Sequence, residues 1–277
     1  MESGKVRVAV IDLYNNEENQ GIRCIKDILN ESNSLYNNIS VDYKLFDTRY
    51  SGAAPDTSYD IYISSGGPGS PWEGEGSDWE TKYFFLMDSL WRHNQNNETK
   101  KYVFFICHSF QIMARYFKLC DVIKRNSKSF GVMPVHKTAE GEKDLLLHGL
   151  PEPFYGADFR EWQVVNPNKK IFDELGAQVL CLEKERSHVN LERAMMAIRV
   201  NDEFVGTQFH PEADASSMYY HFMKPERKEH VVSKYGEQKY FEMLDLLEQP
   251  IGIKLTQKTV LPNFMKHAIN KLRPELV

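Results

Sequence analysis

The chain has 277 residues and a mass of 32.3 kDa, a size that fits one large domain with an appendage or two small domains. Hydrophobic residues make up 42% of the sequence, enough for a buried core, and charged residues make up 26%. The 39 acidic and 34 basic residues leave a net charge of −5, which argues against nucleic acid as the main partner.

Strand-like and helix-like segments alternate through the first two thirds of the chain. Apolar, β-branched runs predict strands at 5–14, 41–46, 59–64 and 101–106. Apolar residues at helical spacing predict helices at 21–29, 79–93 and from Cys107 to about residue 119. This order predicts an α/β fold with a mostly parallel central sheet flanked by helices, whose site is built where the strands end.

Shorter β segments follow from about residue 130. Candidate strands at 131–136, 159–165, 178–183, 194–200 and 204–209 predict a small β region, with a hairpin turn at 201–203. Beyond Glu212 the sequence becomes charged and helical and is broken by prolines. We therefore expect a domain at 1–215 and a C-terminal helical extension at 216–277, which either packs on the core or forms a small interaction module.

Signals for export, membrane insertion and metal binding are missing from the sequence. No stretch approaches the roughly 18 apolar residues of a membrane span, and the N-terminal residues lack the features of a signal peptide. Cys24, Cys107, Cys120 and Cys181 lie too far apart for a disulfide framework or a zinc ribbon. We expect a cytoplasmic protein with no membrane partner, no metal and no organic cofactor.

Cys107 follows the apolar run 101–106 and precedes a predicted helix. Such a junction exposes a side chain at the sheet edge, and the helix N-terminus favours the reactive thiolate. The arrangement follows the logic of a nucleophile elbow, in which small residues flank the nucleophile. The alternative is a buried structural cysteine, since free cysteines are usually buried.

His210 and Glu212 follow the strand predicted at 204–209, with Pro211 between them. In an extended chain, residues two apart face the same way, so the carboxylate can orient the imidazole. A base oriented by a third group is the recurring way to activate a thiol nucleophile. Taken alone, the triplet His-Pro-Glu is more often a surface turn.

Gly66, Gly67 and Gly69 follow the strand predicted at 59–64, in the run Ser-Gly-Gly-Pro-Gly. No Lys-Ser/Thr pair follows them, so a nucleotide-phosphate loop fits poorly. We expect a loop whose backbone N–H groups point at a developing oxyanion. The alternative is a tight turn without a binding role.

In this order, the three motifs resemble a class I glutamine amidotransferase domain, which has a flavodoxin-like fold. The matching runs are residues 63–71 (ISSGGPGSP), 106–111 (ICHSFQ) and 208–212 (QFHPE), and the similarity spans about residues 6–212. The resemblance implies a glutaminase-type hydrolase that releases ammonia from the side-chain amide of L-glutamine through a cysteinyl thioester. Because no synthetase sequence follows Glu212, a synthetase or acceptor partner protein would have to use the ammonia.

The resemblance also implies a role for each matching residue. Cys107 would be the nucleophile, His210 the acid and base, and Glu212 the group that orients His210. Backbone N–H groups of Gly67 and His108 would hold the oxyanion, while Gly66 and Gln111 would bind the substrate.

The sequence departs from the family pattern in two places. Phe105 and Ser109 occupy the elbow positions that are commonly glycine, and residues 160–165 lack the histidine that many members carry. Two alternatives therefore stay open: a γ-glutamyl hydrolase or peptidase acting on a small γ-glutamyl compound, and a non-catalytic amidotransferase-like binding protein. The basic clusters at 124–125 and 225–228 are expected to be solvated.

Overall fold

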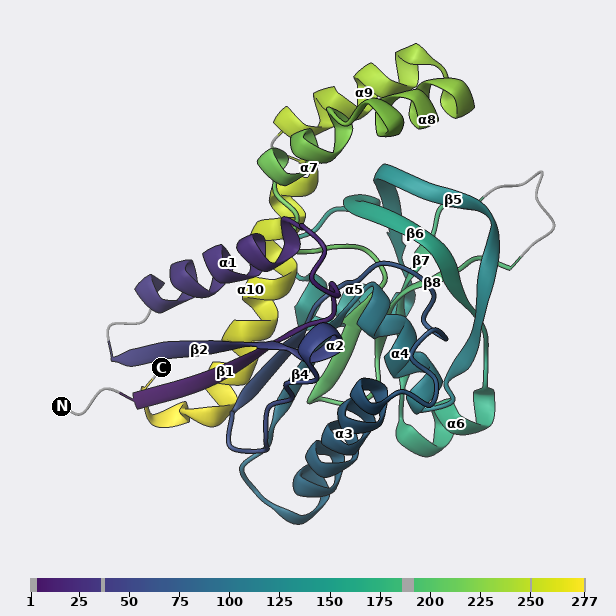
Figure 1. Cartoon of the computed structure of the whole chain (residues 1–277). Coiled ribbons are helices and arrows are strands. Elements are labelled where there is room, and N and C mark those ends of the chain that lie inside the picture. Colours follow the sequence, from purple (N-terminus) through teal and green to yellow (C-terminus); the bar gives the residue numbers. More distant parts are fainter. Residues whose placement is uncertain (1–3, 36–37, 186–191, 250, 277) are drawn as a thin grey trace.

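The computed structural model describes residues 4–35, 38–185, 192–249 and 251–276. Its centre is a nine-stranded sheet with the strand order β2-β1-β3-β4-β9-β8-β7-β5-β6 (Figure 1). The strands are β1 (Gly4–Asp12), β2 (Ile39–Asp47), β3 (Ile61–Ser64), β4 (Tyr102–Ile106), β5 (Cys120–Lys137), β6 (Phe154–Pro167), β7 (Gln178–Glu183), β8 (Met195–Arg199) and β9 (Phe204–Thr207).

The sheet changes character at β9. From β2 to β9 all neighbouring strands are parallel, whereas β8, β7, β5 and β6 continue the same sheet with antiparallel pairing. The predicted α/β fold is confirmed, and the expected small β region forms the antiparallel end of the central sheet. The strand predicted at 131–136 is much longer in the structure, because residues 120–124 and 129–130 also pair with β6.

Helices cover both faces of the sheet (Figure 1). The helices are α1 (Gly21–Leu35), α2 (Thr48–Ser51), α3 (Asp78–Asn96), α4 (His108–Tyr116), α5 (Ala139–Lys143), α6 (Lys169–Leu175), α7 (Ala215–Phe222), α8 (Pro225–Tyr235), α9 (Glu237–Glu248) and α10 (Ile253–Leu272), with short 3₁₀ turns at Leu145–Leu147 and Pro274–Leu276. One apolar cluster joins the sheet to α1 and α10, and a second joins the other face to α3 and α4.

The C-terminal segment has two parts. Helices α7, α8 and α9 pack on the antiparallel strand pair β5–β6 through a third apolar cluster, which includes Phe130, Phe222 and Tyr240. Helix α10 then returns along the sheet and buries Val260, Phe264 and Ile269 beside residues of β1 and β4. The segment thus packs on the core, while a domain boundary at residue 215 remains a prediction. Among the described residues, no helix has both the length and the apolar character required to cross a bilayer.

Candidate active site

Cys107 lies at the turn between β4 and α4, where the carboxyl end of the parallel sheet meets a helix N-terminus. Its backbone φ is +49°, in the left-handed region that a cysteine rarely adopts. The turn is fixed by a hydrogen bond from the Cys107 N–H to the Thr207 carbonyl oxygen (2.7 Å). A strained turn held on both sides is the geometry of a nucleophile elbow.

The two residues that depart from the elbow pattern are both accommodated. The side chain of Phe105 is fully buried in the α3–α4 cluster, and Gly206 on the neighbouring strand β9 leaves room for it. The hydroxyl of Ser109 accepts a hydrogen bond from the Ile106 N–H and donates one to the Ser64 carbonyl oxygen, each at 2.8 Å. Phe105 is therefore part of the core, and Ser109 ties the elbow to β3.

His210 and Glu212 lie beside Cys107, just after β9. The His210 Nδ1 atom is 2.8 Å from Glu212 Oε1, and the two side chains are only 11% and 1% exposed. Burial lowers the pKa of His210, but the charges of Glu212 and Cys107 and the hydrogen bonds to them raise this pKa well above its usual value. The structure thus brings together the three side chains that sequence analysis assigned to one site.

The glycine loop after β3 packs against the same group. A Cβ atom at Gly66 would lie 2.7 Å from Cε1 of His210, and one at Gly67 would lie 2.4 Å from the Leu13 carbonyl oxygen. Only glycine permits these approaches at both positions.

Arg49, on the short helix α2, holds this loop in place. Its buried guanidinium donates hydrogen bonds to the carbonyl oxygens of Pro68 (2.7 Å) and Leu13 (3.3 Å) and to Glu73 (3.0 Å). The role of Arg49 was not predictable from the sequence. A helix of four residues has no detectable periodicity, and nothing in the sequence links Arg49 to the loop.

Two glutamine side chains form a hydrogen-bonded chain that ends at the thiol. Gln208 Nε2 donates to Cys107 Sγ (3.6 Å), and Gln111 Nε2 donates to Gln208 Oε1 (3.1 Å) and to the Trp162 carbonyl oxygen (3.3 Å). Gln111, for which the sequence predicted substrate binding, is in this structure a hydrogen-bond donor to Gln208. Gln208 belongs to the 208–212 motif, but only its position in the fold reveals the contact with the thiol.

His108 follows Cys107 and is 2% exposed. Burial lowers its pKa to about 3, and the nearby positive charges of Arg49 and Arg115 contribute in the same direction. Its imidazole is therefore neutral at physiological pH. The side chain is almost completely enclosed by protein, and the residue forms part of the lining of the cavity around Cys107.

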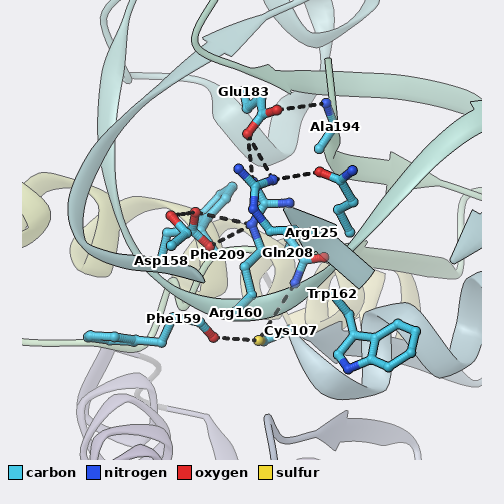
Figure 2. A network of polar contacts seen from close by, with 12 residues as sticks. Cys107, Arg125, Asp158, Phe159, Arg160, Trp162, Glu183, Ala194, Gln208 and Phe209 are labelled. Atoms are coloured by element: carbon cyan, nitrogen blue, oxygen red, sulfur yellow. Dashed lines mark hydrogen bonds and ion pairs between the residues drawn. The ribbon is translucent and has the colours of Figure 1, made fainter. Parts of the chain in front are cut away.

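Strand β6 supplies the wall opposite the elbow. The Cys107 thiol donates to the Phe159 carbonyl oxygen (3.7 Å), as Figure 2 shows. Behind this contact, Arg160 binds Asp158 (3.0 Å) and Glu183 (2.9 Å), and Arg125 binds the same Glu183 (3.1 Å). Arg125, expected to be solvated, is instead buried, because β6 and β7 supply its partners. This network fixes the wall that lacks the family histidine.

Cys107 and the His210–Glu212 pair border one cavity of about 1020 Å³. Its lining includes Tyr14, Gly67, Cys107, His108, Gln111, His210 and Glu212, together with residues 159–162 and parts of α7 and α8. Small-molecule sites usually have roughly 300–1,000 Å³, so the volume of this cavity is at the upper end of that range. Within the described ranges, no group of three or more His, Cys, Asp or Glu side chains could hold a metal ion.

The fold and the site together define an α/β protein with a cysteine at a strand-to-helix elbow and a His–Glu pair beside it. The family model for class-I glutamine amidotransferases matches residues 10–226, and the chain therefore belongs to this family. No curated protein matches the chain significantly.

Several solved structures share the fold. A glutamine amidotransferase from Thermotoga maritima is 19% identical, with 95% of this chain and 98% of that chain covered and a TM-score of 0.63. A glutamine amidotransferase from Methylobacillus flagellatus is 14% identical, with 100% and 96% covered and a TM-score of 0.60. The glutaminase domain of Trypanosoma brucei CTPS with bound acivicin is 14% identical, with 75% and 86% covered and a TM-score of 0.50.

Proposed function

We propose that the protein hydrolyses the side-chain amide of L-glutamine through a thioester on Cys107. The observation that carries this proposal is the elbow conformation of Cys107 next to the buried His210–Glu212 pair. An amide is a poor electrophile, so its cleavage needs an activated nucleophile, a proton donor for the leaving nitrogen and stabilisation of the oxyanion. The residues around Cys107 can meet each of these needs.

In the proposed reaction, His210 accepts the Cys107 proton and the sulfur attacks the amide carbon. The backbone N–H groups of Gly67 and His108 stabilise the oxyanion, and the C–N bond breaks as His210 donates its proton to the departing ammonia. Water, deprotonated by His210, then attacks the thioester, which releases glutamate and restores the thiol. Glu212 keeps the imidazole oriented and stabilises its charged form. The ammonia passes to an acceptor, which a partner protein would supply.

The size of the cavity favours a second candidate with the same chemistry. Since the space beside Cys107 exceeds the needs of one glutamine, a γ-glutamyl amide with a larger leaving amine can also be accommodated. In that reaction the leaving group is an amine instead of ammonia, and no acceptor protein is needed.

The test is covalent labelling with an electrophilic glutamine analogue, measured by intact mass. We expect one label per wild-type chain and none on Cys107→Ala. Labelling measures recognition and thiol attack without a partner protein, so a subunit that needs its partner for turnover still gives a result. A wild-type chain that stays unlabelled, although a small thiol reagent modifies Cys107, would contradict the proposal.

A further inference from the structure

The cavity continues from Cys107 to a wall that is rich in positive charge. We call this the cationic wall; its charged members are Lys128 on β5, Lys224 just before α8, and Arg227 and Lys234 on α8, and the imidazoles of His221 on α7 and His230 on α8 lie among them. None of these residues belongs to the motifs near Cys107. Of the two basic clusters expected to be solvated, 225–228 contributes Arg227 to this wall, and 124–125 contributes Lys124 to the lining of the same cavity.

Aromatic contacts connect this wall with the proposed proton donor. The Phe159 ring contacts the rings of His210 (5.7 Å), His221 (5.3 Å) and Phe130 (4.9 Å). The Arg227 guanidinium lies over the Phe130 ring, 5.2 Å from its centroid. A floor of two phenylalanine rings therefore leads from His210 to Arg227.

The cations of this wall are available to a ligand. Lys224 and Arg227 lie over aromatic rings, and Lys234 donates to the Lys128 carbonyl oxygen. Within the described part of the chain, no carboxylate forms an ion pair with any of these three, whereas Lys128 pairs with Glu161. The buried Nε2 atom of His230 also has no hydrogen-bond partner there.

The positive charges of the wall act on His221, which lies between Arg227 and His210 in this series of contacts. Burial lowers the pKa of His221 to about 4, and the charges of His210, Lys224 and Arg227 contribute in the same direction. Glu226 is the acidic lining residue of α8, while Glu17 and Glu18 belong to the loop between β1 and α1. An acidic ligand group beside Arg227 would thus meet an excess of positive charge.

The rings of Phe159 and Phe130 join the ring of His210 to the cationic wall. In the proposed function, His210 protonates the leaving nitrogen, so a substituent on that nitrogen extends past His210 along the Phe159–Phe130 floor. We infer that the cationic wall binds the side-chain carboxylate of an acidic amino acid whose amine is the leaving group, so that the preferred substrates are γ-glutamyl amides of acidic amino acids. This inference rests on the proposed function and specifies its substrate class.

Cys107, His210 and water account for every bond and proton in this reaction. Cys107 Sγ forms the thioester as the γ-amide C–N bond breaks, and the proton taken by His210 goes to the leaving acidic amino acid. Water then cleaves the thioester and gives free glutamate. No oxidant, reductant or additional reactant is required.

The test compares two matched ligands on the full-length Cys107→Ala protein, which binds without turnover. γ-Glutamylglutamate and γ-glutamylglutamine share the α-carboxylate of the leaving residue and differ only in the end of its side chain, which is a carboxylate or an amide. Calorimetric titration should show about tenfold tighter binding of γ-glutamylglutamate, as for a ligand carboxylate bound by charged donors. Glutamine is titrated in parallel, because it measures the glutamyl pocket alone.

Two changes on the wall should abolish this preference. With Lys224→Gln and Arg227→Gln added to Cys107→Ala, we expect nearly equal affinities for the two dipeptides and unchanged affinity for glutamine. The matched control is Lys228→Gln, which makes the same charge change on α8 at a residue that contacts the Tyr240 ring and does not line the cavity. This control should retain the preference.

The remaining outcomes separate the two proposals. Equal affinities in the Cys107→Ala protein, or a preference that persists in the wall variant, would overturn the role of the cationic wall and leave the glutamyl pocket intact. Binding of glutamine without binding of either dipeptide would do the same. If none of the three ligands binds, the proposed function fails and this inference fails with it.

Discussion

The Nδ1 atom of His210 lies 2.8 Å from Oε1 of Glu212, whose other carboxylate oxygen is buried without a hydrogen-bond partner among the described residues. Among the described residues, the side chain of His210 is therefore the hydrogen-bond partner of this carboxylate. The negative charge of Glu212 favours the imidazolium form of His210.

Replacing Glu212 with Gln should therefore lower both the catalytic activity and the reactivity of Cys107. We expect glutamine turnover to fall by about 10²–10⁴-fold, since the imidazole loses its orienting charge. The rate at which iodoacetamide alkylates Cys107 should also fall, most strongly at pH 6, because the pKa of His210 decreases when the negative charge is removed. Alkylation rates measured from pH 5 to 9 would show this, and an unchanged profile would exclude the proposed role of Glu212.

A second prediction concerns the amide of Gln208, which donates to Cys107 Sγ. Gln208→Glu places an acceptor and a negative charge beside the sulfur, so we expect labelling by the glutamine analogue to slow by about tenfold or more. Gln208→Leu removes only the donor and should have a smaller effect.

Because Gln111 reaches the thiol through Gln208, the effects of Gln111→Leu and Gln208→Leu should not add. A double-mutant cycle on the labelling rate measures this coupling. Fully additive effects would mean that the two glutamines act independently.

The packing at the elbow predicts a stability effect away from the cavity. A Cβ atom at residue 206 would lie 2.9 Å from the Phe105 carbonyl oxygen and 2.9 Å from Cδ2 of Phe110. Gly206→Ala should therefore destabilise the protein by about 1–3 kcal/mol, the usual cost of overpacking a core. Urea unfolding measures this loss, and a variant as stable as the wild type would show that the elbow has spare room.

His108 predicts a pH dependence of stability. Its pKa is about 3 in the native protein and about 6.5 in an unfolded chain, so between these values the unfolded chain binds more protons. The contribution of His108 to stability therefore decreases as pH falls below about 6.5, by roughly 1 kcal/mol per pH unit.

His108→Gln should remove this contribution. Urea unfolding of the variant between pH 7 and pH 5 should show a smaller loss of stability than the wild type over the same range. The exposed His148, changed to Gln, is the control and should leave the wild-type slope unchanged. Equal slopes for His108→Gln and the wild type would contradict the assignment.

Much of the fold was predictable because buried parallel strands appear in sequence as short apolar runs. β3 and β4 illustrate this, since every residue in both strands is buried. The first part of β5, residues 120–129, was not predictable as a strand. Its pairing partners on β6 are distant in sequence, and its side chains are largely polar and exposed.

The residues of the candidate site that lie in short motifs were predictable from the sequence, and their contacts with distant segments were not. Cys107, His210 and Glu212 lie in compact motifs, and the structure places them together. Arg125 was misjudged because a basic residue in a polar segment looks solvated until Glu183 is brought next to it by the sheet. The contacts of Gln208 and Arg49 likewise arise only when separate strands and loops meet.

The hydrogen bonds of Arg49 to the glycine loop and to Leu13 affect the entropy cost of ligand binding. A loop with two adjacent glycines has many accessible conformations, and fixing them costs entropy. Because Arg49 binds two backbone carbonyl oxygens around this loop, that cost is met when the chain folds and not when a ligand arrives. The loop is thus preorganised, and the binding energy of a ligand remains available for chemistry at the sulfur.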